Sequence, residues 1–409
     1  MHSVSSVVSR FFLLLPSYNF PGKHALIPTV RITRRRVTII GSYIVALVMD
    51  MDRLPIEGET VVGRDFHTTF GGKGSNAAVS AARLGAETFF LGKVGRDSFA
   101  AEFITMLDRE GVRREKVLYS PNLPTGVGII LFNSIGTNLI AIDPGANTQL
   151  SPADLEEHLE TIRESSVIVS PLEIPLATAL AGAHLARENR VKAILNPAPA
   201  CDLRNTDLSC VFALTPNETE ARTCLGLPAA DPVPDEELAA ALLALGPEHV
   251  ILTRGAQGVL WASRHGLKKI PALKVNPIDT VGAGDAFNAG LAVGLSEGES
   301  VPHSIALGIT AASLSTEKRE TDGGVENQHA EEGEDEPVVL PFPVAGVVHG
   351  EDEGALENSG EEDDGEAECE GHGILWRMML VFRGEKSFAH ARKEKAGSSP
   401  RSKSERGSE

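Results

Sequence analysis

The sequence is poor in cysteine, in long apolar runs and, over most of its length, in net charge. Its four cysteines, Cys201, Cys210, Cys224 and Cys369, form no CxxC pair and have no histidine at zinc spacing. This excludes a structural zinc site and favours a reducing compartment. No apolar run approaches the roughly 20 residues that cross a bilayer, so neither a structural metal nor a membrane partner is expected.

The negative charge belongs to one stretch. The chain of 409 residues carries a net charge of −18, but 16 acids and no Lys or Arg lie between Ala330 and Gly371. Without that stretch the net charge is −2, so nucleic acid is not an expected partner. Residues 1–36 contain six basic residues and no acid, which predicts a basic leader with the composition of a transit peptide. We expect a cytoplasmic protein, or a plastid or mitochondrial one if the leader directs import.

Between these ends, residues 37–316 alternate segments of strand length with segments of helical period. This alternation predicts an α/β fold with a mostly parallel central sheet and helices on both faces. Strands are expected at 37–42, 88–91, 127–132, 167–169, 193–195, 211–214 and 250–253, and helices at 75–84, 99–110, 155–163, 177–188, 286–295 and 305–315.

Three further regions depart from this alternation. Residues within about 48–70 and 118–142 are richer in Thr, Val and Ile, with turn residues between them, and predict a small β-sheet lid. A lid over the ligand edge of the sheet would exclude water from a bound ligand. Residues 317–409, rich in Glu, Asp, Gly and Ser, predict an acidic, low-complexity, disordered tail.

The most informative stretch is Asp279-Thr280-Val281-Gly282-Ala283-Gly284-Asp285, in which two acids bracket a glycine turn. The next ten residues have helical spacing, so the first free N–H groups and the positive end of the helix dipole predict an anion site. Asp285 could take a proton from a hydroxyl beside the bound phosphate. The combination indicates phosphoryl transfer to an alcohol, and an ordinary strand-turn-helix junction with acidic caps is the alternative.

A second glycine turn, Phe70-Gly71-Gly72-Lys73-Gly74-Ser75-Asn76, opens another predicted helix. Paired glycines let the backbone approach a polar ligand, and Lys73 and Asn76 supply donors suited to hydroxyl groups. The stretch is not a Walker loop, because Gly74 follows Lys73 and no first glycine precedes it at the required spacing. A glycine-rich turn with a solvated lysine is the other interpretation.

Three weaker signals follow other predicted strands. In Thr215-Pro216-Asn217-Glu218-Thr219-Glu220, Asn217 and Glu220 would face the same side of a helix's first turn. A carboxylate there can hold hydrated magnesium, although a helix-capping pair is equally compatible with the spacing. The glycines of Thr253-Arg254-Gly255-Ala256-Gln257-Gly258 could pass under the ribose or phosphates of a nucleotide, and Glu173 is an acid at the same sheet edge.

Together and in this order, these stretches resemble the ribokinase (phosphofructokinase-B type) family of ATP-dependent sugar and nucleoside kinases. The resemblance runs from about Val37 to Ser315 and includes both family signatures, Gly71-Gly72-Lys73-Gly74-x-Asn76 and Asp279–Asp285. It implies a ribokinase-like three-layer αβα domain over residues 37–316. It also implies a homodimer that transfers phosphate from ATP to the primary hydroxyl of a sugar, with D-ribose converted to D-ribose 5-phosphate as the favoured reaction.

The resemblance further implies roles for individual residues. Asp285 would be the general base, and the amides of Gly282, Ala283 and Gly284 would form the anion hole. The sugar would contact Gly72, Lys73, Gly74, Asn76, Glu173, Asp279 and Asp285. ATP would contact Asn217, Glu220, Thr253, Arg254, Gly255, Ala256, Gln257, Gly258, Gly284 and Asp285, with Mg²⁺ held through water by Glu220. A monovalent cation, K⁺, would lie beside the anion hole on Asp279 and Val281.

Two departures from the family pattern keep alternatives open. The family follows its first strand with Gly-Ser-x-Asn-x-Asp, whose Asn and Asp hold sugar hydroxyls, whereas this chain has Ile44 and Ala46 there. After the last helix, the family has a Thr-Arg-x-Gly-Ala-x-x-Ser loop that completes the cation site, and the residues from Thr316 onward do not match it. The alternatives are a kinase for another sugar or nucleoside, and a catalytically impaired pseudokinase or interaction protein.

Overall fold

The large sheet follows the predicted α/β pattern. The computed structural model describes residues 35–135 and 137–317, so the predicted leader and tail lie outside it except for their innermost residues. In this part of the chain, nine strands pair in the order β13-β12-β11-β10-β9-β8-β1-β4-β5. All neighbours from β11 to β5 are parallel, while β12 and β13 add an antiparallel edge that the sequence analysis did not predict. The strands are β1 Arg36–Ile40, β4 Glu87–Val94, β5 Arg113–Tyr119, β8 Val167–Pro171, β9 Lys192–Asn196, β10 Ala213–Leu214, β11 His249–Thr253, β12 Val259–Ser263 and β13 Gly266–Ile270.

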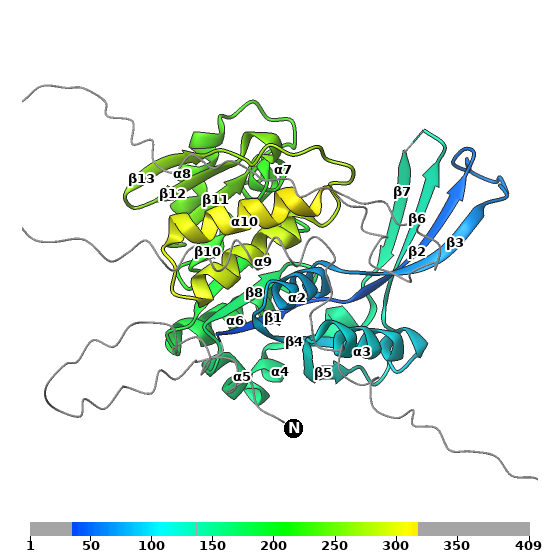
Figure 1. The fold of residues 1–409 in the computed structure, drawn as a ribbon, viewed down its shortest axis with the longest axis horizontal. Coiled ribbons are helices and arrows are strands. Elements are labelled where there is room, and N and C mark those ends of the chain that lie inside the picture. Colours follow the sequence, from blue (N-terminus) through cyan, green and yellow to red (C-terminus); the bar gives the residue numbers. More distant parts are fainter. Residues whose placement is uncertain (1–34, 136, 318–409) are drawn as a thin grey trace, which may run out of the picture. The chain divides into compact units, whose positions relative to one another are not determined.

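The strand order reverses beside β1. The chain first builds outward through β4 and β5, then returns to the other side of β1 with β8 and continues through β9, β10 and β11 (Figure 1). In a parallel sheet such a reversal opens a crevice at the carboxyl ends of the two strands where the direction changes. The residues that follow β1 and β8 are therefore placed to bind a ligand.

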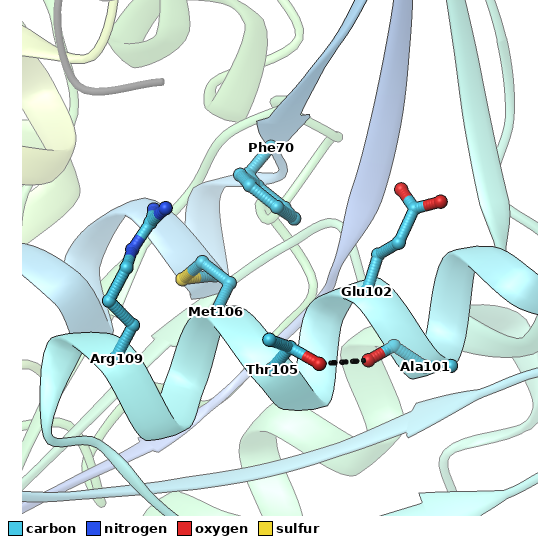
Figure 2. Close-up of a pocket in the computed structure, with 6 residues that line it drawn as sticks. All are labelled: Phe70, Ala101, Glu102, Thr105, Met106 and Arg109. Carbon is cyan, nitrogen blue, oxygen red and sulfur yellow. Dashed lines mark hydrogen bonds between the residues drawn. The ribbon is translucent and has the colours of Figure 1, made fainter. Parts of the chain in front are cut away.

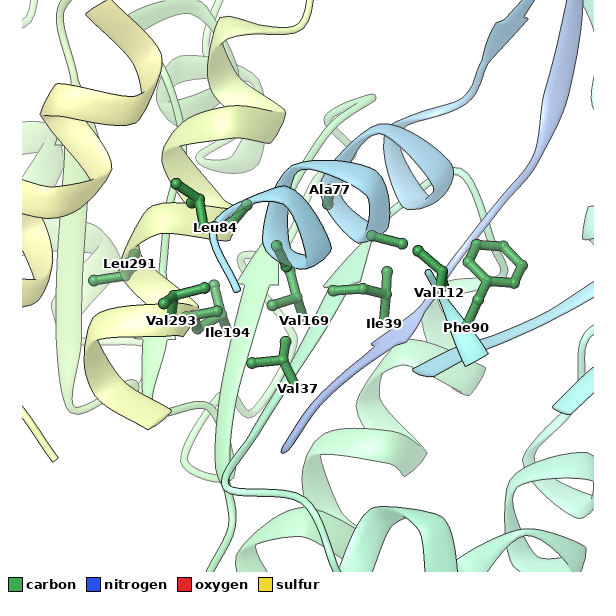
Figure 3. Close-up of a cluster of buried hydrophobic side chains, with 14 of the residues drawn as sticks. Val37, Ile39, Ala77, Leu84, Phe90, Val112, Val169, Ile194, Leu291 and Val293 are labelled. Atoms are coloured by element: carbon green, nitrogen blue, oxygen red, sulfur yellow. The ribbon is translucent and has the colours of Figure 1, made fainter. Parts of the chain in front are cut away.

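Helices cover both faces of the large sheet, and each face has its own apolar core. In β1, Val37 and Ile39 point into one core and Ile40 into the other, as strand alternation requires. Figure 3 shows Val37 and Ile39 among the side chains of the first core, beneath the helix that carries Ala77. The first core is covered by α2 Lys73–Arg83, α3 Ser98–Glu110, α9 Ala283–Ser296 and α10 Val301–Ser315, and the second by α4 Pro152–Glu157, α5 Leu159–Arg163, α6 Leu176–Glu188, α7 Glu218–Cys224 and α8 Asp235–Leu243. The predicted three layers are confirmed.

Two details of the helices differ from the expectation or extend it. The single helix expected at 155–163 was wrong, because the chain forms α4 and α5 instead. They meet at His158, whose backbone (φ −114°, ψ 21°) is not helical. Two short 3₁₀ turns, η1 Gly145–Gln149 and η2 Gly255–Gln257, complete the helical elements of the described part. None of the helices described here is both long and apolar enough to cross a membrane.

A smaller sheet of four strands has the order β3-β2-β6-β7, where β2 is Ile44–Met51, β3 Arg64–Gly71, β6 Gly126–Asn133 and β7 Asn138–Asp143. It lies where composition predicted a second sheet, but its bounds differ. β2 begins at Ile44 because it continues directly from the turn after β1, ahead of the predicted start near 48. Residues 118–119 belong to β5 of the large sheet rather than to the lid, because they pair with Lys93 and Val94 of β4.

The helices α9 and α10, the last two in the described part of the chain, pack closely. A Cβ added at Gly290 of α9 would lie 2.8 Å from Cα of Gly308 on α10, and one added at Gly308 would lie 2.8 Å from the carbonyl oxygen of Phe287. Since real Cβ atoms do not come that near to backbone atoms, the helix pair depends on both glycines. Phe287 follows Asp285 closely in α9, so this contact helps to fix the start of that helix.

We expect Gly308→Ala to destabilise the protein. The added methyl group must push α10 away from the backbone of Phe287. Overpacking of this kind costs about 1–3 kcal/mol, which exceeds the gain of about 0.5–1 kcal/mol from replacing a helical glycine. Urea unfolding measures the loss. Ala306→Ser, on the exposed side of the same helix, is the control and should change stability by less than about 0.5 kcal/mol. Equal stability of Gly308→Ala and the wild type would contradict the close packing.

A second prediction concerns His249, at the start of β11. Its Nδ1 accepts a hydrogen bond from Trp261 Nε1 at 3.3 Å, and its ring meets Phe212 edge-on at 4.9 Å. Burial, together with the nearby positive charges of His265, Arg264 and Lys192, lowers its pKa to about 4. A histidine in the unfolded chain has a pKa of about 6.5. Between about pH 4 and pH 6.5, His249 is therefore protonated in the unfolded state but neutral in the folded state.

The stability contributed by neutral His249 should therefore be present above about pH 6.5 and fall as the pH is lowered towards 4. Urea unfolding of wild type and His249→Gln at pH 7.5 and pH 5 measures it, and the variant should lose less stability on acidification than the wild type. The exposed His303→Gln controls for the general effect of removing an imidazole. A steeper loss in His249→Gln than in the wild type would refute the assignment.

Candidate functional site

The two predicted glycine turns meet, although they are far apart in the sequence. The first leads into α2 at Lys73 and the second into α9 at Ala283, and both helices pack on the same face of the sheet. Asn76, in the first turn of α2, donates from Nδ2 to Oδ2 of Asp285 at 3.0 Å. The candidate base and the candidate hydroxyl-binding turn therefore form one site.

The start of α9 has the geometry of an anion site. Gly282, the residue before the helix, has a left-handed backbone (φ 75°) that favours glycine, and its carbonyl accepts the first helical bond from Ala286 N at 2.9 Å. Gly284 differs, because a Cβ added there would meet nothing within 4 Å. Packing does not require a glycine at that position, so the space beside this first turn is open to a ligand.

Asp285 is a buried acid with a perturbed pKa. Only 5% of the residue is exposed, and burial raises the pKa of its carboxyl to about 6. Lys73 and the hydrogen bond from Asn76 oppose this shift, while the nearby acids Glu173 and Glu220 add to it. A carboxylate whose pKa approaches neutrality, held at a helix N-terminus, is suited to accept a proton from a hydroxyl.

Glu173 bridges the crevice where the strand order reverses. It follows β8, and its Oε2 accepts a hydrogen bond from the hydroxyl of Ser42, which follows β1, at 2.5 Å. The same oxygen accepts the backbone N–H of Lys73 at 2.8 Å. Glu173 thus fixes the glycine turn against the ends of β1 and β8. Ser42 was not assigned a role from the sequence, although its position after the first strand could have pointed to it.

Asn217 and Glu220 form a reciprocal helix cap. Glu220 N donates to Asn217 Oδ1 and Asn217 N donates to Glu220 Oε2, each at 2.8 Å, at the start of α7. The capping interpretation is therefore confirmed. The cap occupies one carboxylate oxygen of Glu220. Burial raises the pKa of this carboxyl, and the capping bond and the nearby charge of Lys73 oppose that shift. Both side chains also line a cavity, so the cap and a role in ligand binding are compatible.

That cavity has a volume of about 180 Å³ and lies among the predicted motifs. It brings together seven of the predicted residues, which are Lys73, Asn217, Glu220, Thr253, Gly282, Gly284 and Asp285. Five further residues without a predicted role also line it, namely Asn196, Ala198, Thr215, Thr280 and Asn288. Three of these five, Asn196, Thr215 and Asn288, join one another through buried hydrogen bonds.

Other predicted residues lie around the cavity without lining it. Gly72, Gly74 and Ala283 belong to the two turns, next to lining residues. Arg254 is buried, and its guanidinium donates to the carbonyl of Gln257 at 3.4 Å, while Gly255, Ala256 and Gln257 are exposed in η2 and Gly258 is buried after it. Val281 is 61% exposed, and its N–H donates to Asp279 Oδ1 at 2.9 Å.

A second hollow, of about 310 Å³, is separate from these residues. It is lined by Phe70 of β3 and by Ala101, Glu102, Thr105, Met106 and Arg109 on α3 (Figure 2). Its wall is mostly apolar, and it contains none of the predicted site residues. The predicted site residues therefore gather at the smaller, polar cavity and not at this hollow.

Comparisons with known proteins identify the family of the chain. Residues 34–328 match the model of the pfkB family carbohydrate kinases. The chain is 36% identical to the ribokinase of Bacillus subtilis over 291 residues, covering 71% of this chain and 96% of that protein. It is 37% identical to the deoxyribokinase of Salmonella typhi over 255 residues, covering 61% and 82%. The structure of Arabidopsis thaliana ribokinase complexed with ribose and ATP superposes with a TM-score of 0.64 at 29% identity, covering 70% of this chain and 93% of that one. The chain therefore belongs to the pfkB family of carbohydrate kinases, enzymes that transfer phosphate to a sugar hydroxyl.

Proposed function

We propose that this protein is an ATP-dependent kinase that phosphorylates the primary hydroxyl of D-ribose to give D-ribose 5-phosphate. The observation that carries the proposal is the contact between Asn76 and Asp285, in which a buried carboxylate at the start of α9 lies beside the glycine turn that opens α2. Ribokinases from several organisms among the relatives support ribose as the sugar.

In this mechanism Asp285 takes the proton of the sugar hydroxyl as its oxygen attacks the γ-phosphorus of ATP, and the bond to the leaving ADP oxygen breaks. The amides of Gly282, Ala283 and Gly284 donate to the transferring phosphate. Gly72, Lys73, Gly74, Asn76, Glu173 and Asp279 hold the sugar. Because Glu173 already binds the backbone of Lys73, it orients the turn as well as the sugar.

The nucleotide would lie against Asn217, Glu220 and the loop Thr253–Gly258. The cap at α7 uses one oxygen of Glu220, so its other oxygen fits a water ligand of Mg²⁺, which would neutralise charge on the phosphates. Asp279 and Val281 share one turn beside the proposed anion hole, and Asp279 Oδ1 accepts the N–H of Val281. The other carboxylate oxygen of Asp279 and the carbonyl of Val281 would hold a monovalent cation such as K⁺.

A different acceptor is the second candidate, because Ile44 and Ala46 stand where the family has polar residues. Both are buried in β2, and the backbone of Ile44 lies against the glycine turn, 2.8 Å from a Cβ added at Gly72. A site built for hydroxyls discriminates strongly when a partner is absent. The relative named deoxyribokinase supports testing a deoxypentose beside ribose.

An impaired enzyme is the third candidate, and one contact favours it. The carbonyl of Thr316, at the end of α10, accepts hydrogen bonds from Ile278 N at 2.6 Å and Asp279 N at 3.1 Å. Thr316, where the match to the family pattern ends, therefore lies beside Asp279, where the family loop would complete the cation site. Their sequence does not match that loop.

A homodimer is part of the proposal. Large apolar side chains are exposed on the small sheet, among them Phe66 (59%), Leu139 (46%), Ile140 (52%) and Ile142 (55%). They lie on β3 and β7, the two edge strands of this sheet. Exposed apolar side chains of this size are typical of a protein interface. Sedimentation of the full chain would test the assignment, and a purely monomeric protein at micromolar concentration would contradict it.

We expect the full-length protein to phosphorylate D-ribose with ATP and Mg²⁺, and Asp285→Asn to lower kcat by about 10²–10⁴-fold, the contribution of a general base. Asp207→Asn, an exposed acid away from the cavity, is the control. The assay panel contains D-ribose, 2-deoxy-D-ribose, hexoses and nucleosides, each with and without K⁺. Turnover restricted to another acceptor would favour the second candidate, and none from a folded protein would favour the third.

The pH dependence gives an independent prediction. Asp285 must be ionised to accept a proton, and burial raises its pKa to about 6. We therefore expect kcat/KM for the sugar to be constant above about pH 7 and to fall towards tenfold per pH unit below about pH 6. Initial rates between pH 5 and 8 measure it. A flat profile down to pH 5 would contradict the assignment of Asp285 as the base.

A further inference from the structure

A buried chain of polar side chains joins the first turn of α9 to the ends of two strands. Asn288 donates from Nδ2 to the carbonyl of Gly284 at 2.8 Å, and its Oδ1 accepts the hydroxyl of Thr215 at 2.7 Å. The carbonyl of Thr215 in turn accepts Nδ2 of Asn196 at 3.1 Å. Asn196 ends β9 and Thr215 follows β10, so three elements are connected.

Because these side chains are buried, breaking one of their hydrogen bonds would cost stability. Asn288 is 3% exposed, Thr215 2% and Asn196 7%, and all three line the cavity of the candidate site. A buried amide or hydroxyl that loses its partner costs about 1–3 kcal/mol, so the arrangement has little freedom to change. Its amide orientation is also fixed, since Nδ2 of Asn288 must face a carbonyl and Oδ1 a hydroxyl donor.

The network holds the part of the helix that would bind phosphate. Gly284 provides both the carbonyl that Asn288 contacts and one of the amides in the proposed anion hole. On the other side, Thr215 is followed by Pro216, whose carbonyl accepts Thr253 N at 2.9 Å, and by Asn217 of the α7 cap. The chain of contacts therefore runs from the nucleotide edge of the sheet to the helix start.

We propose that Asn288 and Thr215 are positioning residues that fix the phosphate-binding turn of α9 relative to the nucleotide edge of the sheet. The inference rests on the proposed function. Both residues would affect how the phosphate is aligned for transfer, and would not affect how tightly the sugar binds. Because a displacement of about 1 Å at a reacting centre can cost about 10²-fold in rate, loss of the Thr215–Asn288 bond should lower kcat more than it changes the KM for the sugar.

Three substitutions of buried threonines test this. Thr215→Val keeps the shape and removes the hydroxyl, and we expect kcat to fall about 10–100-fold, with the sugar KM within about twofold. Thr215→Ser keeps the donor and should restore most of the activity. Thr178→Val is the matched control, because Thr178 is 1% exposed and donates its hydroxyl to the carbonyl of Leu150 at 2.7 Å, outside the cavity. Thr178→Val should lose about as much thermal stability as Thr215→Val, but its kcat should not change.

A double-mutant cycle tests whether the two residues act as one unit. Asn288→Ala removes both hydrogen bonds of the Asn288 side chain. In the double mutant, Thr215→Val should therefore lower kcat by less than about a further twofold. If the two sites were independent, their separate losses of kcat would multiply. Multiplied losses would overturn the proposal. So would an unchanged kcat in Thr215→Val, a rise in sugar KM alone, or an equal loss of kcat in Thr178→Val.

A second readout separates this inference from the proposed function. Titration calorimetry with inorganic phosphate on the full-length protein reports the anion site without any turnover. Thr215→Val and Asn288→Ala should bind phosphate about tenfold more weakly than Thr178→Val, because the amides of the turn are no longer held in place. If the wild type phosphorylates no sugar but the two variants still bind phosphate more weakly than Thr178→Val, the proposed function fails and the positioning role stands. Equal phosphate affinity in all three variants would overturn the positioning role.

Discussion

The site depends on one constraint, the placement of the Asp285 carboxylate out of water at the start of α9. Burying a charged group is costly unless neighbours compensate for the lost water. Here Asn76 donates to it and Lys73 lies near enough to favour its charged form, while Glu173 and Glu220 oppose that form. The balance leaves the pKa of Asp285 near 6, which suits a group that must lose and regain a proton near neutral pH.

Much of the surrounding fold holds that carboxylate in position. The reversal of strand order beside β1 opens the crevice, and Glu173 crosses it to hold both Ser42 and the turn before α2. On the other side, α9 is fixed by its glycine contact with α10 and by the bonds of Asn288. The bonds of Glu173 to Ser42 and Lys73, and of Asn288 to Thr215, join segments distant in sequence. The site therefore forms only when the sheet and both helices are assembled.

The small sheet and the end of α10 are where this chain departs from its family. β2 carries Ile44 and Ala46 beside the glycine turn, and the carbonyl of Thr316 binds the segment that enters the anion-binding turn. Both departures adjoin the proposed sugar and cation sites but leave the Asn76–Asp285 contact intact. The residues proposed for the chemistry and those proposed to select the substrate lie on different elements, so they could change separately.

The sequence alone determined the fold class and the chemistry-bearing turns. Alternating strand and helix periods and the glycine turns at 71–74 and 282–284 are local signals, and they placed α2, α9 and Asp285 correctly. Tertiary structure decided the strand order, the antiparallel edge and the contacts of Ser42, Thr215 and Asn288. The strand order and these contacts depend on partners distant along the chain. A local sequence pattern does not show which strand ends become neighbours.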